Sequence, residues 1–206
     1  ILGKNFFRKK IKFENQPSLE AQVSSLSDDI AYNSHDLEDG LKAKLFKIEQ
    51  LSDLPIIADI IYKHKNKLKH KNKDLVLRQI IRDIINEMVK DVVLNTKKNL
   101  KKEKPKNIND IYKSQNCFVS FSSKMLKFDQ SLKEFLKYHM YFNKEVLKKT
   151  NKGKKIISKL FFLIKKNPKK FFKEKVISKK NKERSICDFI AGMTDRYAIQ
   201  LYNSIK

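Results

Sequence analysis

The amino-acid sequence predicts an all-α protein, an irregular helical bundle. Apolar residues recur at intervals of three and four over most of the 206 residues, as they do along one face of an α-helix. No stretch alternates apolar and polar residues over a useful length, and no turn dipeptide separates two apolar runs, so hairpins are not expected. Glycine and proline are scarce, with four of each, which is compatible with long helices.

The first predicted helix runs from Pro17 to Phe46, with Ser18 as its N-cap and Glu20 in its first turn. On a helical projection, one side gathers the apolar side chains: Val23, Leu26, Ile30, Leu37 and Leu41. The opposite side gathers carboxylates, a phenol and a neighbouring imidazole: Asp28, Tyr32, His35, Asp36 and Asp39.

This acidic stripe allows two interpretations. An amphipathic helix with a solvated acidic face is the simpler one. A ligand site is the other, because the carboxylates have no Lys or Arg among them, although the chain carries a net charge of +24. A cation or a polyhydroxyl ligand would then supply the missing partner.

The same periodicity predicts further helices over residues 54–68, 74–100, 124–149, 154–166 and 183–204. Pro105 and Pro168 end two of them. Gly192 is a weak point inside the last one, unless another backbone packs closely against it. The lysine run 63–73, which includes His64, is expected to be a solvated helix end and loop.

The basic composition suggests a polyanionic partner but does not require one. Only five of the 47 basic residues are arginine, the residue that dedicated phosphate-binding sites favour. A lysine-rich helical protein that binds nucleic acid or serves as a scaffold is therefore kept as the alternative. No long uncharged apolar run predicts a membrane span. Cys117 and Cys187 are far apart, which argues against a zinc site or a disulfide framework and fits a cytoplasmic protein.

Two runs of the first helix, Ala21–Val23 and Ser27–Leu41, resemble the C-terminal metal-ligand helix of HD-domain deoxynucleoside triphosphate triphosphohydrolases, the bacterial dGTPase-like proteins. Further similar blocks follow in the family's order, at Met88–Val93, Phe121–Met125, Leu136–Val146 and Cys187–Ala198. The resemblance extends from about Glu14 to the end of the chain. It implies the C-terminal part of that all-α fold.

The resemblance also implies a metal-dependent enzyme that cleaves dGTP or related dNTPs into deoxynucleoside and inorganic triphosphate. Family members hold a divalent ion (Mg, Mn or another transition metal) with a His, a His-Asp pair and a later Asp. Position by position, Asp28 matches that later metal ligand. Tyr32 matches an aromatic residue beside the sugar and phosphates, and Asp36 matches a carboxylate that hydrogen-bonds the sugar 3′-hydroxyl. Asp29 points off this face, and we expect it to have a structural or capping role.

The earlier His and the His-Asp pair have no counterpart in this sequence. The resemblance therefore places them in a missing N-terminal HD segment upstream of residue 1, assigns no catalytic residue within the chain, and implies that the isolated polypeptide is inactive. It predicts residues 1–50 to be the end of the HD catalytic domain and residues 51–206 to be a helical C-terminal region. The expected partners are a dNTP substrate, the HD segment, further copies in a homo-oligomer and, weakly, nucleic acid, with no membrane.

One departure from the family falls after Met140 and Tyr141. The family usually carries a basic and imidazole pair there, whereas this sequence has Phe142 and Asn143. A substrate or effector role at that position is not carried over.

Overall fold

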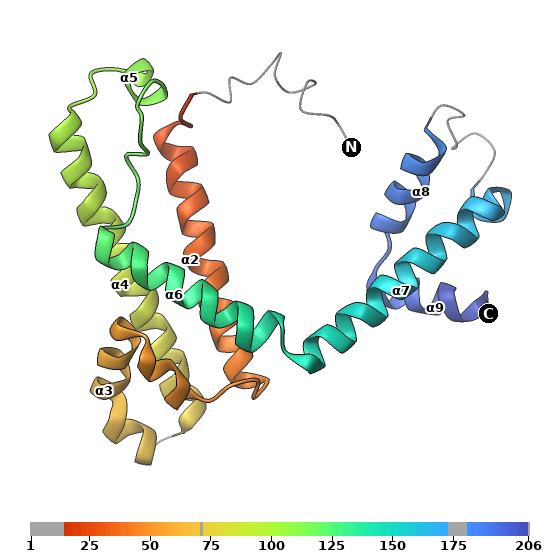
Figure 1. The fold of residues 1–206 in the computed structure, drawn as a ribbon, viewed down its shortest axis with the longest axis horizontal. Coiled ribbons are helices and arrows are strands. Elements are labelled where there is room, and N and C mark those ends of the chain that lie inside the picture. Colours follow the sequence, from red (N-terminus) through yellow and green to blue (C-terminus); the bar gives the residue numbers. More distant parts are fainter. Residues whose placement is uncertain (1–14, 71, 173–180, 206) are drawn as a thin grey trace. The chain divides into compact units, whose positions relative to one another are not determined.

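The computed structural model describes residues 15–70, 72–172 and 181–205. Secondary structure within these ranges is helical and contains no strand, which confirms the all-α prediction (Figure 1). The chain divides into two compact units between Tyr141 and Phe142, called unit 1 and unit 2 below. The division at Tyr141 concerns compactness, whereas the predicted boundary near residue 50 separates the end of the catalytic domain from the C-terminal region, and that boundary stays a prediction. Residues 1–14 of the predicted catalytic part lie outside the described ranges.

Unit 1 is built around four helices that pack in pairs. The long helix α4 (Lys73–Glu103) packs against both α2 (Leu19–Lys42) and α3 (Pro55–His70), and α2 also packs against α6 (Ser123–Leu136). Shorter elements connect or extend these helices: the 3-10 helix η1 (Ile48–Asp53), α5 (Ile108–Tyr112) and the π-helical turn η2 (Lys137–Tyr141).

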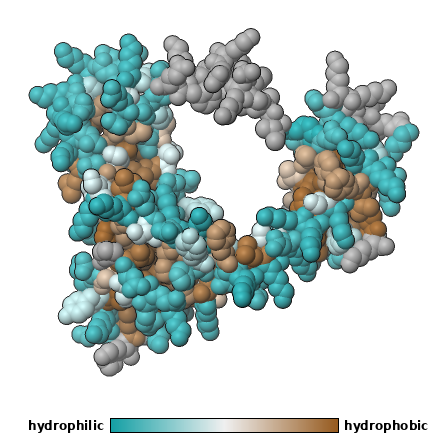
Figure 2. All heavy atoms as spheres, in the orientation of Figure 1, coloured by the Kyte–Doolittle hydropathy of each residue, from teal (hydrophilic) through white to brown (hydrophobic). Residues whose placement is uncertain are grey.

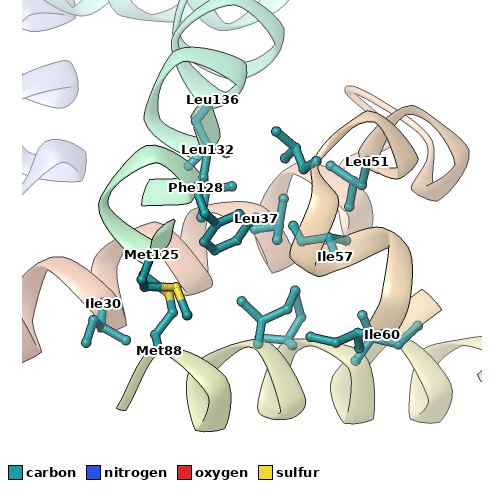
Figure 3. Close-up of a cluster of buried hydrophobic side chains, with 14 of the residues drawn as sticks. Ile30, Leu37, Leu51, Ile57, Ile60, Met88, Met125, Phe128, Leu132 and Leu136 are labelled. Carbon is teal, nitrogen blue, oxygen red and sulfur yellow. The ribbon is translucent and has the colours of Figure 1, made fainter. Parts of the chain in front are cut away.

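The core of unit 1 lies where these helices meet (Figure 3). The predicted core residues Ile30 and Leu37 of α2 are buried, at 5% and 0% exposure. They join a cluster of buried side chains from η1, α3, α4 and α6, among them Leu51, Ile57, Met88, Phe128, Leu132 and Leu136. Removing this much apolar surface from water is what holds α2 in a fixed place.

Val23 was predicted on the same apolar face, but it is 48% exposed. Gln22 is buried instead, because a backbone segment that follows α5 crosses the start of α2. The Gln22 amide donates to the carbonyl of Pro17 at 2.8 Å and accepts the N–H of Val119 at 3.0 Å. A buried backbone N–H needs a partner, so this position requires a polar side chain.

His64 also departs from the expectation of a solvated helix end. It is buried on α3, and its Nε2 lies 2.7 Å from Oδ2 of Asp83 on α4. Gln79, one turn before Asp83, donates to the other oxygen of that carboxylate at 2.9 Å. The pair is part of the interface between α3 and α4.

The helix predicted over residues 124–149 is interrupted. Helix α6 ends at Leu136 and η2 follows it. The next helix, α7 (Lys144–Lys166), includes the whole of the helix predicted over residues 154–166. Asn143 starts α7 because its side chain accepts the N–H of Glu145 at 2.9 Å. Gly153 lies inside α7, where a Cβ would meet no heavy atom within 4 Å apart from the adjacent residues and the nearby backbone of the helix itself.

Unit 2 consists of α7, the 3-10 turn η3 (Pro168–Lys170), α8 (Lys182–Ala191) and α9 (Asp195–Ser204). The predicted last helix is thus two helices. Gly192 ends α8, and Thr194 begins α9 by accepting the N–H of Tyr197 at 3.2 Å. The core of this unit is apolar: Ile156, Leu160, Ile164, Phe172, Ile186, Ile190 and Ala198.

The surfaces of both units are largely hydrophilic on the face shown in Figure 2, with hydrophobic residues between the polar ones. Within the part of the chain that the structure describes, no helix combines the length and the apolarity needed to cross a membrane.

Candidate functional site

The candidate site lies along α2, the helix that carries the acidic stripe. Ser18 caps this helix as predicted, and its side chain accepts the N–H of Ala21 at 3.4 Å. Asp28, Tyr32 and Asp36 follow at intervals of four residues, so they lie on one side of the helix. Asp28 is exposed, Tyr32 is 61% exposed, and Asp36 is half-buried.

Asp36 has a partner that its position in the sequence does not reveal. The hydroxyl of Tyr141, which is 105 residues away and ends unit 1, donates a hydrogen bond to Oδ2 of Asp36. Burial raises the pKa of the Tyr141 phenol, and the hydrogen bond to the Asp36 carboxylate and the nearby Tyr32 raise it further. Tyr141 therefore remains a neutral donor at physiological pH and orients the Asp36 carboxylate.

The π-helical turn η2 places Tyr141 next to α2. A π-helical turn holds more residues than an α-helical turn, so it changes the direction of the side chains that follow. Aromatic packing holds η2 and the end of α6 in place. His139 stacks on Phe135 with ring centroids 4.2 Å apart, and Phe135 packs edge-on against Phe46 at 5.0 Å. Phe46 in turn lies directly against Gly40 of α2, at a position where a Cβ would overlap its ring.

The residues of this stripe do not form a metal site by themselves. Among the described residues, no three His, Cys, Asp or Glu side chains lie close enough together to hold a metal ion. Asp28 offers a single carboxylate, and one oxygen of Asp36 already accepts from Tyr141. A carboxylate is a suitable ligand for Mg²⁺ or Mn²⁺, but one ligand does not make a protein site.

The arrangement is suited to binding a hydroxylated ligand. Asp36 keeps a second oxygen that can accept a hydrogen bond, and its orientation is fixed by Tyr141. Tyr32 provides an exposed ring four residues away, on the side of Asp28. An acceptor, an aromatic face and a second carboxylate thus follow one another along a single helix.

Comparison with known proteins places the chain in a family. Residues 119–204, from within the segment that joins α5 to α6 to the end of α9, match the phosphohydrolase-associated domain. A deoxyguanosinetriphosphate triphosphohydrolase-like protein of Pelagibacter ubique is 50% identical over 205 residues, which cover 100% of this chain and 55% of that protein. The chain belongs to the deoxyguanosinetriphosphate triphosphohydrolase-like family.

More distant relatives carry the same name. The protein of Bartonella tribocorum is 34% identical over 91% of this chain and 48% of its own length. That of Leptospira interrogans serovar copenhageni is 35% identical over 93% of this chain and 52% of its own length. The chain thus spans about half the length of the curated relatives it matches, and in the Pelagibacter protein the matched part is the C-terminal one.

Proposed function

We propose that the protein containing this chain hydrolyses dGTP or related dNTPs and releases deoxynucleoside and inorganic triphosphate. The chain contributes Tyr32 and Asp36 as substrate contacts and Asp28 as one metal ligand. Family membership supports the reaction class, because the relatives are named as triphosphohydrolase-like proteins.

The observation that carries the proposal is the contact of Asp36 with Tyr141. A carboxylate that is only part of a solvated face has no reason to receive a hydrogen bond from a side chain 105 positions further along the chain. Here Tyr141 is bound to one oxygen, while the other is left to accept from a sugar hydroxyl. The neighbouring ring of Tyr32 can pack against the same sugar. Together they recognise the deoxyribose, which every dNTP carries.

In this proposal the metal site is completed by residues outside the chain. Asp28 supplies one oxygen, and the His and His-Asp pair of the family supply the rest from an HD segment. A bound divalent ion lowers the pKa of its water and offsets the charge of the phosphates. We include homo-oligomers and a cytoplasmic location in the proposal on the strength of the family resemblance and of the two isolated cysteines.

Replacing the metal ligand tests this proposal. In the full-length natural protein, Asp28→Ala should lower kcat/KM for dGTP by at least about 100-fold, since even residues that only support metal ligands are worth 10- to 100-fold. The assay is the release of inorganic triphosphate. Asp59→Ala, which removes an exposed aspartate of α3, is the matched control and should stay close to the wild type. Equal activity in the two variants would contradict the assignment of Asp28.

The alternative, a lysine-rich nucleic-acid-binding or scaffold protein, stays a prediction. Lysines are exposed at the end of α4, at positions 97, 98, 101 and 102, and along α7. They carry charge but specify no partner. Association with nucleic acid would fall steeply with salt and would be unaffected by Asp28→Ala.

A further inference from the structure

A polar cluster joins α2 to α6 beside the candidate site. Asn33 of α2 donates from Nδ2 to Oδ1 of Asp129 on α6 at 3.2 Å. The ammonium group of Lys133, one turn further along α6, lies 2.9 Å from Oδ2 of Asp129 and 3.2 Å from Oδ2 of Asp29. Two residues four apart on one helix therefore face two residues four apart on the other. We call these four residues the α2–α6 polar cluster.

The centre of the cluster is buried, and each oxygen of its buried carboxylate has a hydrogen-bond or ion-pair partner. Asn33 and Asp129 are 6% and 4% exposed. A buried carboxylate is costly unless it is paired and hydrogen-bonded, and both oxygens of Asp129 have a partner. Burial of the Lys133 ammonium works against its charge, but the hydrogen bonds to Asp129 and Asp29 outweigh this and raise its pKa. Removing either partner would leave a poorly compensated charge between the helices.

Two residues of the cluster are direct sequence neighbours of the candidate site residues on α2. Asp29 and Asn33 directly follow Asp28 and Tyr32 in the sequence. Successive side chains on a helix differ by about 100° in direction. Fixing the directions of Asp29 and Asn33 therefore also fixes those of Asp28 and Tyr32. If α2 turned by about 20° about its axis, a side-chain atom roughly 6 Å from the axis would move by about 2 Å. Misplacing a catalytic group by about 1 Å can cost roughly 100-fold in rate.

We propose that Asp129 and Lys133 are positioning residues that set the rotation of α2 about its own axis. Their influence reaches Asp28 and Tyr32 through the backbone of α2, and neither residue touches the substrate. Apolar packing alone leaves this rotation less defined, because it is nearly non-directional, whereas hydrogen bonds hold specific atoms together. Since the role concerns the site of the proposed hydrolysis, it rests on the proposed function.

The test is a set of lysine variants in the full-length natural protein, assayed with dGTP well below the melting temperature. Lys133→Met should lower kcat/KM by about tenfold or more, at the lower end of what supporting residues contribute. Lys133→Arg keeps a cation between the two carboxylates and should restore most of the activity. Lys165→Met is the matched control, because it removes a lysine from an ion pair of unit 2, 2.8 Å from Glu183, and should match the wild type.

The outcomes separate the positioning role from the proposed function. If Lys133→Met lowers the melting temperature but keeps the wild-type kcat/KM, the cluster is structural only and the positioning role is overturned. The same holds if Lys133→Arg is as impaired as Lys133→Met. A wild-type protein that hydrolyses no dNTP refutes the proposed function instead, and does so before any variant is compared.

Discussion

The two units bury different kinds of side chain. Among the described residues, all five of the buried polar ones belong to unit 1: Gln22, Asn33, Ser34, His64 and Asp129. The core of unit 2 is apolar, and its ion pairs, such as Arg184 with Asp188 at 2.8 Å, lie at the surface. Buried polar groups add direction to packing at a cost in desolvation. Unit 1 therefore has the means to orient a helix, whereas unit 2 is held by apolar packing.

The largest expected effects test whether the units are separately stabilised. Leu132 of α6 and Leu160 of α7 are both fully buried, one in each core. Either Leu→Ala change should destabilise its own unit by about 2–5 kcal/mol through lost apolar burial and a cavity. Differential scanning calorimetry should show one transition lowered by about 10 °C or more and the other retained. A single transition that both variants lower equally would contradict the division.

A smaller effect is expected from two glycines, one in each unit. Gly40→Ala would force a methyl group into the ring of the buried Phe46 and should cost about 1–3 kcal/mol. Gly153→Ala meets open space in the interior of α7 and should stabilise by about 0.5–1 kcal/mol. Urea unfolding measures both. A neutral Gly40→Ala would show that Phe46 can move away from α2 at little cost.

The smallest expected effect concerns the pair of His64 and Asp83. Burial alone would raise the pKa of Asp83, but the hydrogen bonds from His64 and Gln79 outweigh it and the pKa is lowered. Its ionised form therefore stabilises the fold above about pH 4, and this contribution is lost as the pH falls through the lowered pKa. Because Asp83 is partly exposed, we expect less than about 1 kcal/mol.

Urea unfolding between pH 2 and 6 checks this expectation. Asp83→Asn should flatten the loss of stability in acid, while Asp59→Asn on the exposed side of α3 should leave the wild-type profile. An unchanged acid profile in Asp83→Asn would show that the pair contributes nothing measurable.

Local sequence patterns predicted the helices and the core but not the contacts between distant segments. The 3.6-residue period located α2, α3 and α4 and the inward side of Ile30 and Leu37. Helix ends were missed where a cap competes with a continuous pattern, as at Asn143 and Thr194. No period distinguishes these caps from interior residues before the packing is known.

The sequence likewise predicted only part of the candidate site. The side of α2 that carries Asp28, Tyr32 and Asp36 follows from periodicity, and their roles remain proposals from the family resemblance. The contact with Tyr141 depends on a π-helical turn and joins residues that are 105 positions apart, so no local sequence pattern predicts it. The sequence wrongly predicts a solvated position for His64, because its partner, Asp83, lies on another helix.

The most direct test of the account asks whether Asp36 recognises the sugar 3′-hydroxyl. The kcat/KM values for dGTP and for 2′,3′-dideoxy-GTP are measured in the full-length wild type and in Asp36→Ala. A site built to hydrogen-bond a hydroxyl rejects the analogue that lacks it, so the wild type should prefer dGTP by about 10-fold or more, and the variant should show a ratio near one. An equal preference for dGTP in both proteins would contradict the central claim that this side of α2 binds the substrate.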